Sequence, residues 1–281
     1  MLKTLKLAWL LCMVQFCAMP CLANNSNLDP ATELITWGVT PLANGRLHLA
    51  WAKPVLDALS KRTGLKVEFG SARTLSLFLG NVVDGEYDIV NLPTHIALYL
   101  MRYHGFKPVV RLKANASIVL ISKKVGMGGG FSNFSKVDLV LPDPISLAGF
   151  LAEDYFLSEG SQISIRYMDN HWQVIEGVLK EPAKIGAVVD ILLKFISQGT
   201  RQQIEVLHRF ETQFILSNIM LVRPGTSEIF IERLQYGLEG DFPNSPIYEI
   251  RPVALEDFNS SFDRLNKYIE SIRERMPGLH Q

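Results

Sequence analysis

The chain has 281 residues, and its 28 basic side chains balance 28 acidic ones, so its formal net charge is zero. This balance gives no support for a nucleic-acid-binding surface, which would need a strong positive excess. All three cysteines lie near the start of the chain, at Cys12, Cys17 and Cys21. The rest of the chain therefore cannot carry a thiol nucleophile, a disulfide or a cysteine-bound metal.

Residues 1–23 have the pattern of a secretory signal peptide. Lys3 and Lys6 form a short positive region, and Leu7–Phe16 is apolar except for one glutamine. Small residues at the end of the segment match the site that a signal peptidase reads. The apolar run is too short to cross a bilayer of about 30 Å as a stable helix. We therefore expect export, with the mature chain beginning near Asn24.

A lipoprotein, with Cys21 as the lipidated residue, is the alternative to a soluble exported product. Pro20, directly before that cysteine, fits this alternative poorly. Removal of residues 1–23 leaves 258 residues and two more acidic than basic side chains. A chain of this length can bury a sizeable core and forms two lobes more naturally than one.

From Glu33 onwards, short apolar runs alternate with amphipathic stretches, which is typical of βα units and mainly parallel sheets. The first apolar run ends at Thr40 and predicts a buried strand. The stretch after it has apolar residues at helical spacing and is closed by Gly64, which predicts a helix. The elements expected in the first half are strands at 34–39, 65–69, 87–92 and 107–112, and helices at 47–62, 74–83 and 95–103.

A second series of similar units follows the first. We interpret the glycine-rich run at 126–130 as a flexible connection, because no lysine follows it in the position that a phosphate-binding loop requires. The elements expected in this half are strands at 117–122, 137–141, 163–167, 185–189, 204–208 and 219–222, and helices at 146–157, 171–179, 191–196, 227–238 and 255–275.

Three junctions between a strand and the following helix are candidate binding sites. Ligands of open α/β sheets bind beyond the carboxyl ends of the strands, where helix N-termini offer unpaired N–H groups to anions. Thr40 and His95 lie at two of these junctions, and Ser146 lies at the third. Ser146 is a good N-cap, and Gly149 in the first turn would let a ligand approach the backbone. The alternative is that Ser146 only caps the helix and Gly149 packs against a strand.

Further candidates lie at the ends of later strands. His171 begins a helix directly after a strand and can donate to an oxyanion, or it can be a surface or capping residue. Asp190 ends an apolar strand, and its carboxylate can bind a ligand donor or cap the next helix. Asn218, just before the last predicted strand, and His95 carry the same two interpretations.

Known catalytic motifs are absent from the sequence. It has no Gly-x-Ser-x-Gly elbow, no His-Glu-x-x-His and no phosphate-cradling loop that ends in Gly-Lys-Ser/Thr. Glu153 and Asp154 are adjacent on a predicted helix and therefore point apart, which does not suit paired acid–base chemistry. We expect no enzymatic activity, no cofactor and no metal site.

Several segments together resemble the periplasmic binding proteins of phosphate, phosphite and phosphonate ABC transporters. They are Gly38–Pro41, Trp51–Leu56, Asp84–Ile89, Leu141–Gly149 and Ile185–Asp190. The resemblance covers most of the mature chain. It implies a type II periplasmic-binding-protein fold, in which two α/β lobes, each a mostly parallel sheet flanked by helices, are joined by two crossing strands.

The resemblance also implies the bounds of the two lobes. Lobe one would comprise residues 24–117 and 222–281, and lobe two residues 118–221. The crossing strands would be those at 117–122 and 218–222. A ligand would bind in the cleft between the lobes, which would close by a hinge motion.

In such a fold, Ser146 and the backbone N–H groups of Leu147, Ala148 and Gly149 would hold an oxyanion. His171 and Asp190 would complete the site in lobe two, and Thr40 and His95 would face them from lobe one. The family usually has hydroxyl side chains where this chain has Leu147 and Ala148. Their replacement favours a less highly charged or partly apolar anion.

The function that the resemblance implies is capture of a small, phosphonate- or phosphate-like anion in the periplasm for an ABC importer. The expected partners are the ligand and a membrane permease; nucleic acid is not expected, and the protein would be a monomer. One alternative is a periplasmic sensing module that presents its closed form to a membrane receptor. The other is a periplasmic enzyme on the same scaffold that uses His171.

Overall fold

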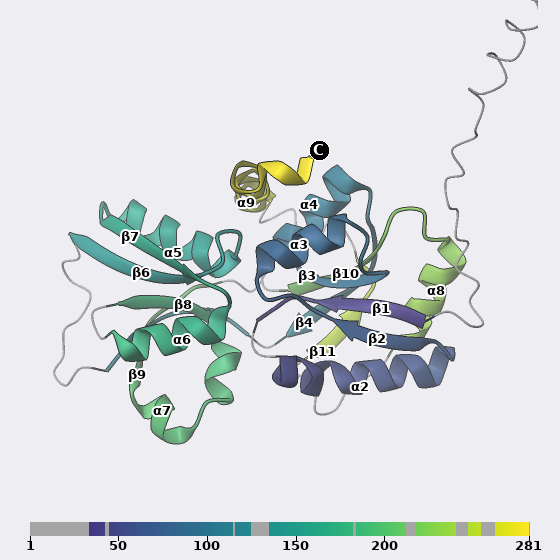
Figure 1. Cartoon of the computed structure of the whole chain (residues 1–281), viewed down its shortest axis with the longest axis horizontal. Coiled ribbons are helices and arrows are strands. Elements are labelled where there is room, and N and C mark those ends of the chain that lie inside the picture. The colour runs from purple at the N-terminus through teal and green to yellow at the C-terminus, as the bar shows by residue number, and fades with distance from the viewer. Residues whose placement is uncertain are drawn as a thin grey trace, which may run out of the picture.

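The computed structural model describes residues 34–42, 45–114, 116–124, 135–181, 184–211, 217–239, 247–253 and 262–280. The predicted signal peptide and the glycine-rich run at 126–130 lie outside these ranges. The described residues form two lobes, each built on its own sheet with helices on both faces (Figure 1). Within the described ranges, no helix has both the length and the apolar character that crossing a bilayer requires.

Lobe one contains a six-stranded sheet in the order β11-β4-β10-β3-β1-β2. Strand β1 pairs in parallel with β2 and β3, whereas β10 lies antiparallel between β3 and β4. The direction of β4 is therefore that of β1, β2 and β3. The strands are β1 (Leu34–Val39), β2 (Lys66–Gly70), β3 (Ile89–Pro93), β4 (Lys107–Ala114), β10 (Ser217–Val222) and β11 (Ile247–Arg251).

Helices α2 (Gly45–Thr63) and α8 (Glu228–Gly237) pack together on one face of this sheet, and α3 (Leu75–Val83) and α4 (Thr94–His104) cover the other (Figure 1). The apolar runs that predicted the strands are the buried ones, since Val90, Leu92, Ile219 and Leu221 are all fully buried. This packing fixes where β1 and β3 end, and therefore where lobe one meets lobe two.

Lobe two contains a five-stranded sheet in the order β7-β6-β8-β5-β9. Strand β6 is parallel to β7 and β8, and β5 lies antiparallel between β8 and β9. The strands are β5 (Ile118–Lys123), β6 (Lys136–Pro142), β7 (Gln162–Met168), β8 (Ile185–Val189) and β9 (Ile204–Arg209). Helix α5 (Leu147–Ser158) covers one face, and α6 (His171–Lys180), the 3-10 helix η1 (Asp190–Lys194) and α7 (Gln198–Gln202) lie on the other (Figure 1).

The predicted fold class is confirmed, and most strands of each sheet run in one direction. The two strands expected to cross between the lobes are β5 and β10, and each enters its sheet against that direction because the chain reaches it from the other lobe. The expected lobe boundary between residues 221 and 222 is wrong. Strand β10 pairs along its whole length with β3 and β4, so residues 217–222 belong to the sheet of lobe one.

Three of the described elements were not predicted: α7, β11 and the 3-10 helix η3 (Pro277–His280). Helix α7 has only five residues, none of them buried, so it lacks the apolar stripe that would mark it. Strand β11 is a short edge strand that alternates apolar and charged residues and pairs with β4 alone. The helix expected at 255–275 is described from Phe262 onwards, as α9 (Phe262–Arg275), and is followed by η3.

Helix α9 lies across the junction of the two lobes (Figure 1). It packs against α4 of lobe one, where Tyr103 donates a 2.7 Å hydrogen bond to Glu270. On the other side, the ring of Tyr268 stacks on Phe150 of α5 with centroids 5.1 Å apart. The C-terminal helix therefore contacts both lobes at once.

Candidate functional site

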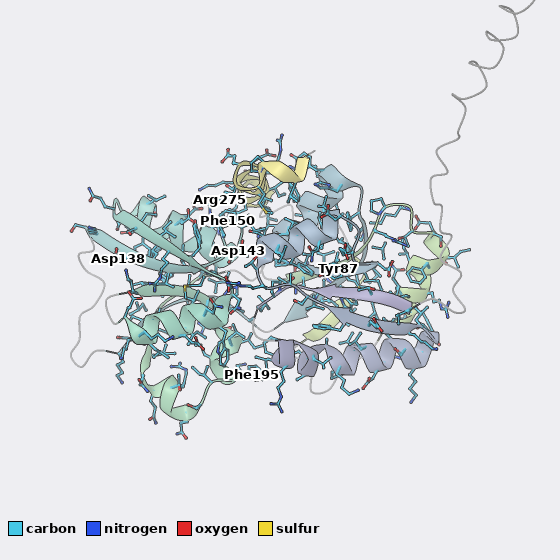
Figure 2. All side chains as sticks on the ribbon, in the orientation of Figure 1. Tyr87, Asp138, Asp143, Phe150, Phe195 and Arg275 are labelled. Atoms are coloured by element: carbon cyan, nitrogen blue, oxygen red, sulfur yellow. The ribbon has the colours of Figure 1, made fainter. Side chains whose placement is uncertain are left out.

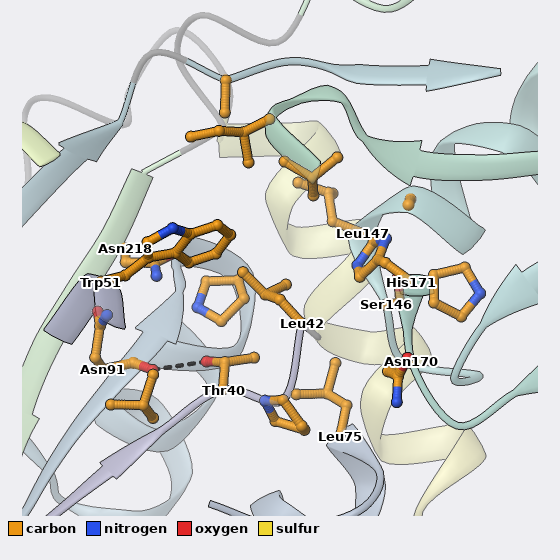
Figure 3. A pocket seen from close by; sticks show the side chains of 18 of the residues that line it. Thr40, Leu42, Trp51, Leu75, Asn91, Ser146, Leu147, Asn170, His171 and Asn218 are labelled. Carbon is orange, nitrogen blue, oxygen red and sulfur yellow. Dashed lines mark hydrogen bonds between the residues drawn. The ribbon is translucent and has the colours of Figure 1, made fainter. Parts of the chain in front are cut away.

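A cavity of about 160 Å³ lies between the lobes, at the carboxyl ends of β1, β3, β6 and β8. Lobe one contributes side chains such as Thr40 and Trp51, and lobe two contributes others such as Ser146 and His171 (Figure 3). Its position at the ends of parallel strands agrees with the general rule for ligand sites in α/β sheets. We refer to it below as the interlobe pocket.

The N-terminus of α5 points its first turn at the interlobe pocket. Ser146 is buried and caps the helix, and its hydroxyl accepts a 3.5 Å hydrogen bond from the Gly149 N–H. Leu147 and Ala148, the first two residues of the helix, line the pocket. The first N–H groups of a helix have no intrahelical acceptor and carry its positive partial charge, so this end of α5 suits an anion.

His171 is the first residue of α6 and lines the pocket from the same lobe. Asn170 caps α6 by accepting a 3.1 Å hydrogen bond from the Gln173 N–H. The imidazole of His171 is 6% exposed, and its Nδ1 makes no hydrogen bond within the described part of the chain. Burial lowers the pKa of His171 to about 3, so the ring is neutral near pH 7. The unpaired nitrogen of a neutral imidazole can donate or accept one hydrogen bond with a ligand, depending on the tautomer.

Lobe one contributes polar atoms from β1 and β3. The Thr40 hydroxyl donates a 2.6 Å hydrogen bond to the carbonyl of Asn91, which leaves its oxygen as an acceptor (Figure 3). Asn91 and Trp37 line the pocket, and Asn91 Oδ1 and Trp37 Nε1 are buried and make no hydrogen bond among the described residues. An unpaired buried polar group costs free energy, and a ligand that pairs with it removes that cost.

The start of β10 closes the lobe-one side. Asn218 and Ser217 both line the pocket. Ser217 Oγ accepts a 3.0 Å hydrogen bond from Arg111 Nε and lies 2.9 Å from the Thr94 hydroxyl. Arg111 is buried behind this serine and does not itself line the pocket. Its guanidinium orients the Ser217 hydroxyl, which belongs to a lining residue.

A protein family matches this chain over a region that contains all of the pocket lining except Trp37. The model of the family described as "ABC transporter, phosphonate, periplasmic substrate-binding protein" matches residues 38–240. The chain belongs to this family. The predicted family resemblance is thereby confirmed, and the members of the family are periplasmic binding components of ABC transporters. No curated protein sequence matches the chain at a significant level.

Solved structures of phosphonate-binding proteins share the fold. PhnD1 of Prochlorococcus marinus, solved with methylphosphonate, has a TM-score of 0.67 at 11% identity and covers 85% of this chain and 99% of its own. A binding protein of a phosphonate ABC transporter from Pseudomonas aeruginosa has a TM-score of 0.66 at 12% identity. The alignment covers 88% of this chain and 99% of that protein. The aliphatic sulphonate binding protein SsuA of Escherichia coli has a TM-score of 0.60 at 13% identity. The alignment covers 85% of this chain and 93% of that protein. At these identities, the likeness shows the fold.

Six of the nine residues predicted for the site line the interlobe pocket of this family member. They are Thr40, Ser146, Leu147, Ala148, His171 and Asn218. Gly149 lies in the first turn of α5 but not in the lining. A Cβ built there would come within 3.7 Å of the Asp143 carbonyl, so a side chain would point into the preceding loop. Whether these residues bind a ligand stays a prediction.

His95 and Asp190 also lie outside the lining, and each has another contact. His95 is fully buried at the junction of the lobes, where its Nε2 donates a 3.0 Å hydrogen bond to the Ile145 carbonyl of lobe two. Burial lowers the pKa of His95 to about 4. Asp190 accepts a 2.8 Å hydrogen bond from the Ser117 N–H and forms an ion pair with Arg209. In this structure these two residues stabilise the frame around the pocket.

The lining also contains residues that were not predicted for the site, and among them are Trp37, Trp51 and Asn91, whose polar side-chain atoms are buried in lobe one. Asn91 had the clearest signal, because a polar residue in the buried strand Ile89–Pro93 needs a partner. The two tryptophans have large apolar side chains, and a sequence pattern alone assigns them to the core.

Proposed function

We propose that this protein binds a small oxyanion in the interlobe pocket and delivers it to the permease of an ABC importer. The observation that supports the proposal best is the convergence of two helix N-termini, those of α5 and α6, on one buried pocket. Such ends attract anions through their unpaired N–H groups and their macrodipoles. Membership of a phosphonate transport family agrees with this chemistry.

Both lobes supply groups to the proposed ligand site. Ser146, with the first N–H groups of α5, and His171 would hold the oxyanion from lobe two. Trp37 would donate to it from lobe one through its unpaired indole N–H, and the unpaired Asn91 Oδ1, an acceptor, would pair with a protonated oxygen or another donor of the ligand. Because the ligand contacts both lobes, it stabilises the closed form, and a permease can recognise that form. Because one chain supplies all the described residues of the interlobe pocket, binding requires only a monomer.

Binding to a panel of anions tests the proposal. The mature chain from Asn24 is screened by thermal shift and titration calorimetry against phosphate, phosphite, methylphosphonate, sulfate, ethanesulfonate and acetate. A ligand at a hundredfold excess over its Kd raises the free energy of unfolding by about 2.7 kcal/mol. A shift with at least one oxyanion is expected. No shift and no heat with any of them would contradict the proposal.

A charged substitution in the first turn of α5 tests the place of binding. Leu147→Asp puts a carboxylate in the pocket, and its position at the start of the helix offsets part of the cost of burying the charge. Leu147→Asn has the same shape without the charge and is the matched control. We expect the aspartate variant to bind the anion at least about tenfold more weakly than the asparagine variant. Equal affinities in two folded variants would remove α5 from the site.

A further inference from the structure

The interlobe pocket is mostly apolar away from the helix N-termini. Leu42, Trp51 and Leu75 enclose it from lobe one, and Leu147 and Ile191 enclose it from lobe two. Figure 3 shows Trp51, Leu42 and Leu147 around one space, with His171 beside Leu147. Apolar walls of this kind contribute to affinity only when the ligand has an apolar part of its own.

The lining of the pocket carries too little positive charge to match a doubly charged anion. Among the described residues of the lining there is no lysine or arginine, and there are two carboxylates, Asp143 and Asp169. Asp169 is paired with Arg73, with 2.7 Å between Nε and Oδ2. His171 is neutral because it is buried. The favourable potential in the lining comes from the two helix ends, each worth about half an elementary charge, because Arg111 lies behind Ser217, outside the lining, and has partners of its own.

This balance matches one negative charge better than two. A buried charge that is not matched by opposite charge or hydrogen bonds is strongly disfavoured. Two helix ends together offer about one positive charge. A dianion would therefore keep about one charge unmatched in a pocket whose other walls are apolar.

The size of the pocket supports the same conclusion. An engineered cavity of about 150 Å³ binds benzene, which has six non-hydrogen atoms. The interlobe pocket, at about 160 Å³, therefore accommodates about six to eight such atoms. An oxyanion head with a short alkyl group has this size, and a bare tetrahedral oxyanion would leave the apolar walls without a contact.

We propose that the ligand is a singly charged oxyanion, a sulfonate or a singly ionised phosphonate, that carries an apolar group of about two to three carbon atoms. This inference rests on the proposed function, because it assigns the substrate class of the same pocket. The oxyanion lies at the N-termini of α5 and α6, and the alkyl group lies against Trp51, Leu42 and Leu147. The apolar residues that replace the hydroxyls of the family thus contribute to selectivity.

Titration calorimetry with matched ligands tests the chain-length dependence. The probes are sulfate, methane-, ethane-, propane- and hexanesulfonate, with phosphate and propylphosphonate as the phosphorus pair. Each methylene that becomes buried should tighten binding about fourfold up to propane, and hexanesulfonate should bind more weakly because it exceeds the cavity. Sulfate or phosphate binding as tightly as its propyl counterpart would overturn the inference and leave the proposed function intact. Failure of every probe would overturn both.

The pH dependence separates the two head groups. A sulfonate keeps one charge throughout, whereas a phosphorus oxyanion loses its second proton at about pH 6 or above. We expect the affinity for propylphosphonate, relative to propanesulfonate, to fall as the phosphonate becomes doubly charged. A relative affinity that rises with pH would show that the pocket prefers a dianion and would contradict the inference.

One substitution tests the apolar wall without touching the helix ends. Leu42→Ser should reduce the gain from ethane- to propanesulfonate, while the affinity for sulfate changes little. Leu77→Ser is the control, because Leu77 is a half-exposed leucine of α3 that lies outside the lining. A chain-length dependence that survives Leu42→Ser unchanged would exclude this wall as the alkyl site.

Discussion

Asp143 connects the two lobes through its carboxylate. Its backbone has φ 34°, a left-handed conformation that non-glycine residues adopt rarely and at a cost. One carboxylate oxygen accepts a 2.8 Å hydrogen bond from the Ser76 N–H, and the other accepts a 2.7 Å hydrogen bond from the Ser76 hydroxyl. Ser76 lies in the first turn of α3, so an anionic side chain of lobe two binds the N-terminus of a lobe-one helix. Figure 2 shows Asp143 at this junction.

We expect Asp143→Asn to loosen the closed form. Asparagine tolerates the same backbone conformation but lacks the charge, and hydrogen bonds to charged groups contribute about 1.5–3 kcal/mol. Small-angle scattering should show a larger radius of gyration without ligand, and calorimetry should show weaker ligand binding because the competent form is less populated. Asp138→Asn, which removes a carboxylate at the far end of lobe two, is the control. Equal behaviour of the two variants would contradict a role in closure.

His95 and His171 make stability depend on pH. Burial lowers their pKa values to about 4 and about 3, whereas an unfolded histidine titrates near 6.5. Below about pH 6.5 the unfolded chain binds protons that the folded chain does not, so stability is full above that pH and is lost as the pH falls. Each histidine should cost about 2 kcal/mol of unfolding free energy between about pH 7 and about pH 5.

Urea denaturation at the two pH values measures this effect. The variants His171→Asn and His95→Asn should each lose less unfolding free energy between these pH values than the unaltered chain, by about the 2 kcal/mol that one histidine contributes. A variant with the same dependence as the unaltered chain would show that its ring is protonated in the folded protein at pH 5. These denaturation experiments should be made without ligand, because an oxyanion beside the ring would raise the pKa of His171 from its value of about 3 and so change the slope.

At the scale of single residues, the sequence predicted the pocket in part. Ser146 and His171 were found because each follows a strand and begins a helix, which is a local property. Asn91 and Trp37 were not found, because alternate residues of a strand face opposite sides and only the tertiary structure shows which strand end borders the pocket. The sequence places Asp143 in a loop, and its contact to Ser76 cannot be predicted locally because the two residues are 67 positions apart.

At the scale of elements, Gly186 sets the position of α6. A Cβ on this residue of β8 would come within 2.7 Å of Val174 and Val178, so the helix packs directly on the glycine. His171 stands at the N-terminus of the same helix. The close approach of α6 to the sheet therefore places this imidazole in the interlobe pocket.

Gly186→Ala should push α6 away from the sheet. Overpacking of this kind costs about 1–3 kcal/mol of unfolding free energy, and the shift of His171 should also weaken anion binding. Gly80→Ala is the matched control, because nothing lies within 4 Å of a Cβ there and alanine favours the interior of α3. Denaturation and calorimetry measure both effects. Unchanged stability and affinity in Gly186→Ala would mean that α6 accommodates the methyl group without moving.

Most elements could be predicted because their apolar patterns are local. Strand β8 is a continuous buried run, β10 is buried except at Asn218, and helices such as α5 and α6 begin at clear N-caps. Strand β11 could not be predicted in the same way, because it is stabilised by pairing with β4, far away in the sequence. The lobe boundary at β10 was misplaced for the same reason, since membership of a sheet depends on the partner strands.

At the scale of the whole molecule, α9 joins the lobes on the side that Figure 2 shows around Arg275 and Phe150. Arg275 donates to Glu153 of α5 at 2.7 Å and to the Pro144 carbonyl at 2.6 Å, and its guanidinium lies 4.8 Å from the centre of the Phe150 ring. The same helix is held on α4 by Tyr103 and Glu270. Opening of the lobes must therefore separate α9 from one of them.

Arg275→Ala should favour the open form and weaken ligand binding. The ion pair is largely buried, with 28% of the Arg275 and 12% of the Glu153 side chain exposed, so charge-assisted hydrogen bonds there contribute more than a surface pair. A loss of about 1 kcal/mol from the closed form corresponds to an affinity about fivefold lower. Scattering without ligand and calorimetry with ligand measure the two effects.

Arg273→Ala is the control on the same helix. Arg273 pairs with Glu270 at 2.7 Å and lies over the Tyr103 ring at 5.1 Å, so among the described residues its contacts are with α9 and lobe one. It should leave closure and affinity unchanged. If the two arginine variants lost affinity equally, the effect would come from the net charge of α9. If only Arg275→Ala lost it, the C-terminal helix would stabilise closure through its contact with lobe two.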